Sequence, residues 1–274
     1  MEFPYDQSYF KDKTAVVTGG GGGLGLALAE EMLDSGASKI VIADINQDRL
    51  DEAMAHLNKT YDGRVKAIVC DVTKEDEVKD LIAQSHEFFD GSLDLLFNNA
   101  GAAFGGWFDD LSDDDWEDAF DLNFRSALYG CRAAIPLMLE AGNGQIVNII
   151  SGIALVPMAK QSRYAATKAA LNGLSLALRT EYWDDNIKIS SATPGTTATH
   201  IFADANQEIP PDAQTPHYSA SRILDGVAKN NRIIFGSDSD AESGKWAFHP
   251  DAQVEYDQYL IPILKARKEG GTGL

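Results

Sequence analysis

A tyrosine and a lysine stand four residues apart, at Tyr164 and Lys168, within a stretch of helical periodicity. Residues four apart share one face of a helix, so the ammonium group would lie near the phenol. A nearby cation favours the phenolate, and we expect it to lower the pKa of Tyr164 from its usual value near ~10. Such a tyrosine can donate or accept a proton at an alcohol oxygen near neutral pH.

Ser151 ends a short apolar run that we interpret as a strand. Ligands of open α/β sheets bind at the carboxyl ends of the strands, so the serine hydroxyl could hold the same alcohol oxygen. A Tyr-x-x-x-Lys pair alone is usually a surface feature. This pair is surrounded by alanines, which indicates a closely packed helix: Ala165, Ala166, Ala169 and Ala170.

Residues 18–25 read Thr-Gly-Gly-Gly-Gly-Gly-Leu-Gly and lie between a predicted strand and a predicted helix. Glycine permits positive φ and close approach of a ligand to the backbone. The helix N-terminus offers free N–H groups and a partial positive charge to a pyrophosphate. A flexible turn is the alternative for any glycine run. No Gly-Lys-Ser/Thr follows, which disfavours a nucleoside triphosphate loop.

Asp44 follows the second predicted strand. A carboxylate there can accept hydrogen bonds from an adenosine ribose, and it would repel a 2′-phosphate. The glycine run contains no arginine or lysine, and none directly follows Asp44, so we expect NAD instead of NADP. The alternative is that Asp44 only caps the next helix, and the same alternative holds for Asp71 after the third strand.

Short β-branched runs alternate with helical periodicity along the chain. The predicted strands are 14–18, 39–43, 65–70, 93–98, 145–151, 187–193 and 232–236. The predicted helices are 24–33, 47–57, 73–89, 113–140 and 162–183. This alternation indicates an α/β fold with a parallel sheet covered on both faces. We expect a single domain over residues 1–274, with its core at about 11–236.

Two segments fall outside this alternation. Residues 195–217 are irregular, and a long irregular insert is typical of a substrate lid. It contains His200 and His217, for which substrate contact is one alternative. The tail from about 237 to 274 is acidic and then aromatic. Its aromatic side chains would either edge the pocket or pack on a neighbour: Trp246, Phe248, Tyr256 and Tyr259.

The formal net charge of −19 would repel nucleic acids and anionic membranes, so neither is an expected partner. The five histidines show no ligand spacing, and we expect no metal site. Ser112 before Asp113, Asp114 and Asp115 indicates a capped helix start instead of a metal site. Cys70 and Cys131 are interpreted as small core residues, and a reducing cytoplasm is the expected location.

In all, the chain resembles the short-chain dehydrogenase/reductase family, in an NAD-dependent branch of about this length, over roughly residues 11–236. The matching residues are, in chain order, Thr18, Gly19, Gly23, Gly25, residues 98–101 (Asn-Asn-Ala-Gly), Asn123, Ser151, Tyr164, Lys168, Pro194, Gly195 and Thr199. The thirteen-residue step from Ser151 to Tyr164 also fits the family pattern. The chain departs from it in having five consecutive glycines where bulkier residues often stand.

The resemblance implies a Rossmann-type, doubly wound sheet of about seven strands in the order 3-2-1-4-5-6-7. It also implies that Tyr164 transfers the proton and Lys168 binds the nicotinamide ribose. Ser151 would orient the substrate oxygen, and Asn123 would hold a water in a proton relay. The implied NAD-binding residues are Gly19, Gly23, Leu24, Gly25, Asp44, Asp71, Val72, Asn99, Ala100, Gly101, Tyr164, Lys168, Pro194, Gly195 and Thr199.

The pocket positions taken from the family are mainly apolar: Phe104, Trp107, Ile153, Leu155, Pro157, Ile201 and Phe202. We therefore expect a hydrophobic or bulky alcohol or ketone, such as a hydroxysteroid or an aryl or alicyclic alcohol. The resemblance further implies a homodimer or homotetramer assembled through residues 113–140 and 162–183. The rival functions are an NADP-dependent carbonyl or acyl-thioester reductase and a non-catalytic nucleotide sensor.

Overall fold

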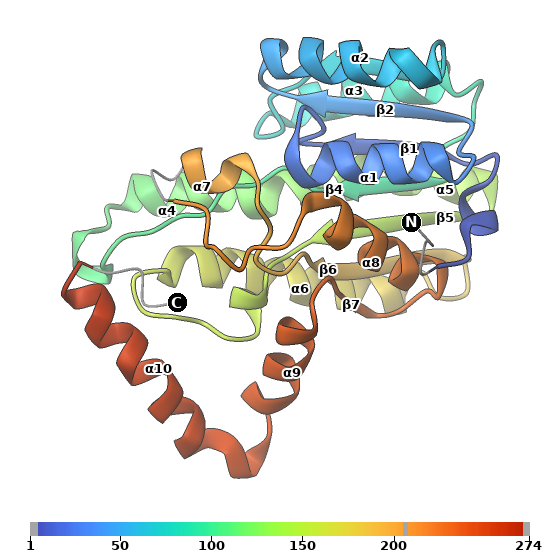
Figure 1. The fold of residues 1–274 in the computed structure, drawn as a ribbon. Helices are drawn as coiled ribbons and strands as arrows, with labels where there is room; N and C mark the ends of the chain where they lie inside the picture. The colour runs from blue at the N-terminus through green and yellow to red at the C-terminus, as the bar shows by residue number, and fades with distance from the viewer. Residues whose placement is uncertain (1–4, 205–207, 271–274) are drawn as a thin grey trace.

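The computed structural model describes residues 5–204 and 208–270 (Figure 1). Residues 205–207 of the predicted lid lie outside the described residues, as do 271–274 of the predicted tail and residues 1–4.

Seven parallel strands form one sheet in the order β3-β2-β1-β4-β5-β6-β7. The strands are β1 (Thr14–Thr18), β2 (Lys39–Asp44), β3 (Val65–Val69), β4 (Leu95–Asn98), β5 (Gly144–Ile149), β6 (Ile187–Thr193) and β7 (Ile233–Phe235). This is the doubly wound Rossmann-type fold, and the predicted strand order is confirmed. Two strand ends differ from those predicted from the sequence. Asp44, expected just after the second strand, lies inside β2, and Ser151, expected at the end of the fifth strand, lies two residues beyond β5.

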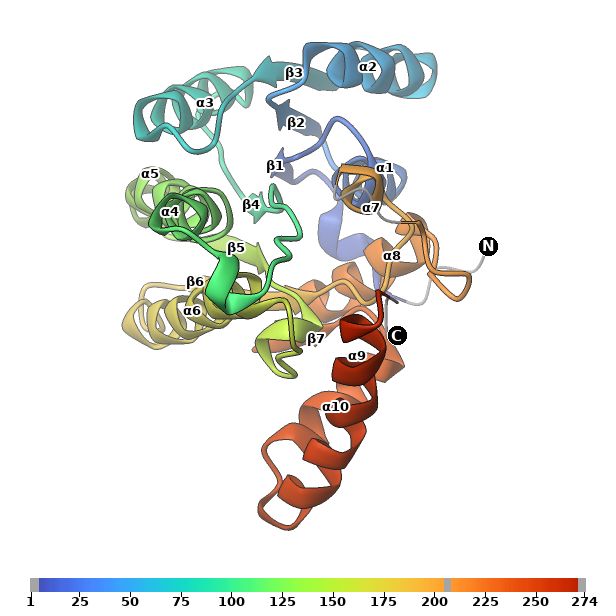
Figure 2. The ribbon, with the colours of Figure 1, turned by 90° about the vertical axis from the view of Figure 1, so that its left-hand side faces the viewer.

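Helices cover both faces of the sheet (Figure 2). Successive strand residues point to opposite faces, so Ala15 and Val17 pack in one hydrophobic cluster and Val16 in the other. The first cluster includes residues of α1 (Gly23–Asp34), α2 (Gln47–Tyr61) and α8 (Pro216–Ala228). The second includes residues of α3 (Glu75–Phe88) and α5 (Ser126–Ala141), with residues of α6 (Ser162–Glu181) packed against it. All five residues of β1 are buried, as expected for a central strand of a parallel sheet.

The long helical region predicted at 113–140 contains three parts. They are α4 (Asp113–Phe120), a π-helical segment (Asp121–Arg125) and α5. The helix starts as expected, because Ser112 and Asp115 form a reciprocal capping box. The π-helical segment was not predicted, and segments of this kind occur often at functional sites.

Four α-helices of the described residues were not predicted from the sequence: α7 (His200–Asp204), α8, α9 (Asp238–Ala247) and α10 (Gln253–Lys268). Thr215 caps α8 by accepting a hydrogen bond from the N–H of Tyr218, and Pro216 stands at the first helical position. We call residues 238–268 the C-terminal arm. It projects from the sheet as a V of two helices, α9 leading away from β7 and α10 leading back (Figure 1).

Short elements complete the fold: 3-10 helices at Gln7–Phe10, Phe108–Asp110, Gly152–Ala154 and Pro250–Ala252, and α7 (His200–Asp204). No helix in residues 5–204 or 208–270 has the length and apolar character needed to cross a membrane.

Candidate active site

The carboxyl ends of β1 and β4 mark the point where the strand order reverses, which is where ligands of such sheets bind. The glycine loop, residues 18–25, leaves β1 there and enters α1. Gly19 and Gly23 have φ of 64° and 53°, a conformation that favours glycine. A Cβ on Gly25 would overlap the carbonyl oxygen of Gly19, so helix and loop can pack this closely only because Gly25 has no side chain. The loop therefore fits a pyrophosphate at a helix N-terminus.

Asp44 turns its carboxylate toward this loop. Its Oδ2 accepts a hydrogen bond from the N–H of Gly21 at 3.2 Å, and its Oδ1 accepts one from the N–H of Asn46 at 3.0 Å. The N-cap of α2 is Asn46, whose side chain accepts from the N–H of Arg49. The helix-cap alternative for Asp44 is therefore wrong.

Arg49 is a residue that the sequence analysis overlooked. Its Cβ lies 3.0 Å from the position that a Cβ on Gly21 would occupy, so this arginine stands beside the glycine loop. It lies five residues after Asp44, on α2, and so outside the residues directly after the strand, which include no arginine or lysine.

Asp71 and Val72 follow β3. Asp71 Oδ1 accepts from the N–H and hydroxyl of Thr73, at 3.0 and 2.7 Å, so this oxygen stabilises the turn before α3. The N-cap of α3 is Lys74, so Asp71 is not the cap residue. Val72 is buried in the cluster beneath.

The Asn-Asn-Ala-Gly segment joins β4 to the glycine loop. Thr18 Oγ1 accepts from the N–H groups of Asn99 and Ala100, at 3.0 and 3.1 Å. The Asn99 side chain donates to the carbonyl of Thr18 at 2.8 Å. Asn98 instead points into the core, where it donates to Asn148 at 2.8 Å. These contacts hold the two strand ends at a set distance across the crevice.

Asn123 and Lys168 meet at Gly101. A Cβ on Gly101 would lie 2.7 Å from Asn123 Oδ1 and 3.1 Å from Lys168 Nζ. Asn123, in the π-helical segment, is only 1% exposed and pairs with the backbone of Ala102 through both its amide atoms. Lys168 Nζ donates to the carbonyl of Ile149 at 2.9 Å. The asparagine and the lysine thus share one polar site at the end of β5.

Ser151 and Tyr164 complete this group, and we call Asn123, Ser151, Tyr164 and Lys168 the catalytic corner. Tyr164 is buried among Ile153 and Ala165, and a hydrogen bond links its phenol to the Ser151 side chain. Ser151 caps the 3-10 helix that follows it, where its hydroxyl accepts from the N–H of Ile153 at 3.3 Å.

The pKa of Tyr164 differs from the expectation. Burial raises it, the hydrogen bond with Ser151 lowers it, and the negative charge of Asp240 raises it. The net direction is upward, so the expected lowering by Lys168 is wrong for this structure. Burial also lowers the pKa of Lys168, to about 8, which weakens the lysine as a source of positive charge.

The predicted pocket residues are only partly brought together. Phe104 packs beside Ile153 and Tyr164, and two residues that the sequence analysis missed join them, Ala103 and Met158. Arg163 stacks its guanidinium 5.1 Å from the centre of the Phe104 ring. Its Nη1 also donates to Asp115 of α4 at 2.8 Å, and this hydrogen bond holds the guanidinium against the Phe104 ring.

Among the described residues, Trp107, Leu155 and Pro157 are not members of this cluster. Lys160 Nζ lies 5.9 Å from the centre of the Trp107 ring. Leu155 is buried, whereas Pro157 is exposed.

The two ends of the predicted lid are hydrogen-bonded to each other, and we call this part the lid base. Gln214 exchanges backbone hydrogen bonds with Thr196 and Ala198, each of 2.9 Å. Beyond the base, Thr199 lies against Gly23 and the His200 ring lies against Gly22, each 3.0 to 3.3 Å from where a Cβ would stand. The beginning of the lid therefore lies over the glycine loop. Ile201 and Phe202 follow on α7, and among the described residues they are not members of the cluster around Tyr164.

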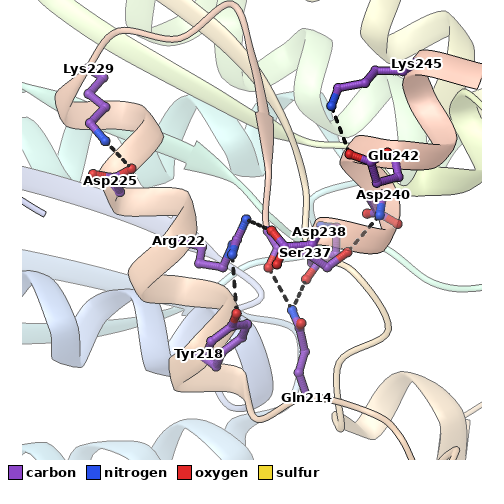
Figure 3. Close-up of polar contacts among 12 residues, drawn as sticks. Gln214, Tyr218, Arg222, Asp225, Lys229, Ser237, Asp238, Asp240, Glu242 and Lys245 are labelled. Atoms are coloured by element: carbon purple, nitrogen blue, oxygen red, sulfur yellow. Dashed lines mark hydrogen bonds and ion pairs between the residues drawn. The ribbon is translucent and has the colours of Figure 1, made fainter. Parts of the chain in front are cut away.

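The lid base is also bonded to the sheet (Figure 3). Gln214 Nε2 donates to the carbonyl of Pro194 at 2.7 Å and to that of Gly236 at 3.0 Å. Gly195 has φ of 74°, and its N–H donates to Asp240 Oδ2 at 3.1 Å. Asp240 comes from the C-terminal arm, and the sequence analysis had treated it only as part of an acidic tail.

The aromatic residues of the tail lie mostly within the arm itself. A cavity of about 260 Å³ between α9 and α10 is lined by Glu242, Ser243, Trp246, Glu255, Tyr256 and Tyr259. Phe248 is 69% exposed. In the part of the chain that the structure describes, no three His, Cys, Asp or Glu residues are grouped as metal ligands would be.

Comparison with known proteins gives a consistent result. A family model described as short chain dehydrogenase matches residues 13–210. An uncharacterized oxidoreductase of Staphylococcus aureus is 36% identical over 195 residues, which are 71% of this chain and 82% of the relative. The 2,5-dichloro-2,5-cyclohexadiene-1,4-diol dehydrogenase LinX of Sphingobium indicum is 33% identical over 233 residues, 84% of this chain and 90% of LinX.

Solved structures agree in fold. A short-chain dehydrogenase/reductase from Burkholderia phymatum, in complex with NAD, has a TM-score of 0.80 and 26% identity, covering 90% of this chain and 96% of its own. The apo form of LigO from Sphingobium has a TM-score of 0.76 and 29% identity, covering 95% and 97%.

Proposed function

Because this chain belongs to the short-chain dehydrogenase family, we propose that it is an NAD-dependent dehydrogenase of secondary alcohols that also reduces the corresponding ketones. The observation that carries the proposal is the catalytic corner. It contains two pairs of complementary side chains: Asn123 and Lys168 lie beside Gly101, and Ser151 is hydrogen-bonded to Tyr164, which stands one helical turn before Lys168 on α6.

The bound nicotinamide would supply the hydride acceptor or donor. Tyr164 moves the proton between its phenol and the alcohol or ketone oxygen, and Ser151, which is hydrogen-bonded to it, orients that oxygen. Lys168 is held by the carbonyl of Ile149 and lies beside Asn123, which would hold a water that exchanges the proton with Tyr164 by way of the Lys168 ammonium. The apolar residues packed around Tyr164 limit the access of water.

The glycine loop would hold the pyrophosphate, and Asp44 the adenine ribose. Residues 99–101, Val72, Pro194, Gly195 and Thr199 follow the carboxyl ends of β4, β3 and β6 and would hold the remaining parts of the dinucleotide. The NAD preference rests on the Asp44 carboxylate, which would repel a 2′-phosphate. Arg49 beside Gly21 favours the rival, an enzyme that uses NADP, because a guanidinium can pair with that phosphate.

A bulky apolar alcohol is the proposed substrate. Phe104, Ile153 and Met158 give the space beside Tyr164 an apolar wall. A family relative, LinX, is named for its action on a chlorinated cyclohexadiene diol, which supports a cyclic alcohol. We also propose a homodimer or homotetramer through the helices at 113–141 and 162–181. Light scattering that finds only monomers at micromolar concentration would contradict this assembly.

The function is tested by measuring NADH and NADPH binding, followed by a panel of secondary alcohols and ketones with the preferred cofactor. We expect tighter NADH binding and turnover of cyclic or aryl alcohols. Turnover of polyols alone would overturn the substrate class, and NADPH preference would overturn the role of Asp44. Tight cofactor binding without turnover of any substrate would favour a nucleotide sensor.

A further inference from the structure

The C-terminal arm brings a carboxylate to the edge of the catalytic corner. Asp240 stands in the first turn of α9, where its N–H donates to Ser237 Oγ at 3.1 Å. Its Oδ2 accepts from the N–H of Gly195, in the segment that follows β6. Its Oδ1 lies 2.7 Å from the position of a Cβ on Gly152, the residue directly after Ser151.

Two glycines make this approach possible. A side chain at Gly152 would collide with Asp240, and a Cβ on Gly195 would lie 2.7 Å from Ser237 Cβ. The turn after Ser151 and the turn after Pro194 are therefore both open on the side where α9 begins. This fit between two parts of the sheet edge and one helix start is specific, because a residue larger than glycine at either turn would displace the arm.

The start of α9 is also fixed from outside (Figure 3). Arg222 of α8 pairs with Asp238 at 2.7 Å, and Gln214 donates to the carbonyl of Gly236. These contacts leave Asp240 turned inward, partly buried, while Asp238 is 82% exposed. The two carboxylates thus belong to the same helix turn but occupy different surroundings.

We propose that Asp240 is a positioning residue of the active site, through which the arm's negative charge opposes formation of the Tyr164 phenolate. Burial raises the pKa of Tyr164, the hydrogen bond with Ser151 lowers it, and the negative charge of Asp240 on α9 raises it further. Lys168 follows Tyr164 one helical turn later on α6, and the exposed Asp238 is paired with Arg222.

This inference rests on the proposed function, and it specifies which direction of the reaction Asp240 favours. A carboxylate that keeps Tyr164 protonated favours the proton-donating role, which ketone reduction requires. For alcohol oxidation the tyrosine must be deprotonated, so the same carboxylate moves the active range to higher pH. Burial raises the pKa of Asp240 itself, so its full charge develops at higher pH than for an exposed aspartate.

The test compares two variants that remove the same charge from the same helix turn. In Asp240→Asn, kcat/KM for alcohol oxidation should begin to rise at a pH lower by on the order of half to one unit, because a like charge near Tyr164 is gone. In Asp238→Asn, the shift should stay below about 0.2 unit, because an exposed charge is screened. Asp240→Glu, which retains the charge, should restore much of the original profile.

Equal profiles for Asp240→Asn and Asp238→Asn would overturn the inference. A thermal unfolding scan checks that each variant is folded. If Asp240→Asn does not fold, Asp240→Ser tests the same loss of charge with a smaller side chain that still offers an oxygen to the N–H of Gly195.

The ionisation of Tyr164 can also be followed without turnover. The ultraviolet absorbance of tyrosinate is titrated in the parent protein and in Asp240→Asn, each with and without Tyr164→Phe. If no alcohol is oxidised, the proposed function fails, but the titration still decides the inference. The part of the absorbance change that Tyr164→Phe removes belongs to Tyr164. If its midpoint pH is the same in Asp240→Asn as in the parent protein, the inference is contradicted.

Discussion

The glycine loop and the C-terminal arm both lie at the carboxyl edge of the sheet, but different interactions hold them. The loop continues from β1, all of whose residues are buried, and it is joined to β4 through Thr18 and Asn99. The arm contains no fully buried side chain in α9. Its described contacts with the body are the polar groups near its ends, such as Asp238 and Asp240 at the start and Arg267 near the finish, and the packing of Gly244 beside Leu155 and Phe235.

This difference has a consequence for function. A loop built from buried backbone can hold a cofactor in one geometry, so changes there should alter cofactor binding and turnover. An arm held by a few polar contacts can change without loss of the fold. We therefore expect body substitutions to act on kcat and cofactor affinity, and arm substitutions to act on KM and on pH dependence.

The largest effect should come from Tyr164→Phe, which removes the proton donor but keeps the ring in its apolar cluster. We expect kcat to fall by about 10²- to 10⁴-fold, the usual contribution of a general acid or base, with NADH binding nearly unchanged. Steady-state kinetics and a fluorescence titration measure the two quantities. Tyr218→Phe, an exposed position on α8, is the matched control. Retention of most activity in Tyr164→Phe would make the assigned mechanism wrong.

The next effect concerns Asp44→Asn, at the end of β2. Losing a charged acceptor should weaken NADH binding by about tenfold or more and should improve NADPH binding, because the repulsion of a 2′-phosphate is removed. Isothermal titration of both cofactors measures the change. Asp48→Asn in the first turn of α2 controls for the net charge. An unaltered NADH to NADPH ratio would favour Arg49 as the determinant instead.

A smaller effect follows from the buried Lys168. Its pKa is about 8 in the folded protein, and that of an unfolded lysine is near ~10.4. Between these values the unfolded chain binds more protons, so this lysine makes the free energy of unfolding rise with pH across that window. Between pH ~8 and ~9, the free energy of unfolding of the parent protein should therefore rise by about 1 kcal/mol more than that of Lys168→Met.

Urea unfolding of both proteins at several pH values measures this difference. The thiols of Cys70 and Cys131 also change the free energy of unfolding in this range, because they titrate near ~8.5 in the unfolded chain, whereas burial raises the pKa of each to about 12 in the folded protein. Since both proteins contain these thiols, their contribution cancels in the comparison. A difference that stays constant with pH would show that Lys168 titrates normally.

The smallest effect is expected in the arm. Arg267 on α10 donates to the carbonyl of Ala159 and to Gln161 Oε1, at 2.5 and 3.2 Å, just before the helix that bears Tyr164. Arg267→Gln should raise KM about threefold with little change in kcat, because the wall near Met158 loosens. The exposed Lys268→Gln removes the same charge and should have no effect. A fall in kcat equal to the rise in KM would indicate that the arm acts on the chemistry itself.

The sequence predicted the body well because its signals are local. Glycine spacing, strand alternation and the Ser112 cap each depend on neighbours within a few residues, and the strand order followed from the family resemblance. The start of α8 had such a signal in Thr215 and Pro216, but it was absorbed into the lid assignment.

The rest depends on distant contacts. Nothing local to Asp240 distinguishes it from its exposed neighbour Asp238, and only the two glycines at 152 and 195 reveal its position. The direction of the Tyr164 pKa was missed for the same reason, since it depends on burial that a four-residue spacing does not report. Helices α9 and α10 were missed because their acidic and aromatic composition gave no helical pattern.

In the π-helical segment each backbone hydrogen bond spans one residue more than in the α-helices that flank it. Each residue of an α-helix turns the chain by about 100°, so the segment sets the angular phase of everything that follows in α5. Gly130 lies on that helix, where any side chain would collide with Asn98 of β4. Loss of one residue from 121–125 would rotate Gly130 away and present a bulkier neighbour. The position of Asn123 and the packing of α5 against β4 therefore depend on the same segment, and on its length as well as on its sequence.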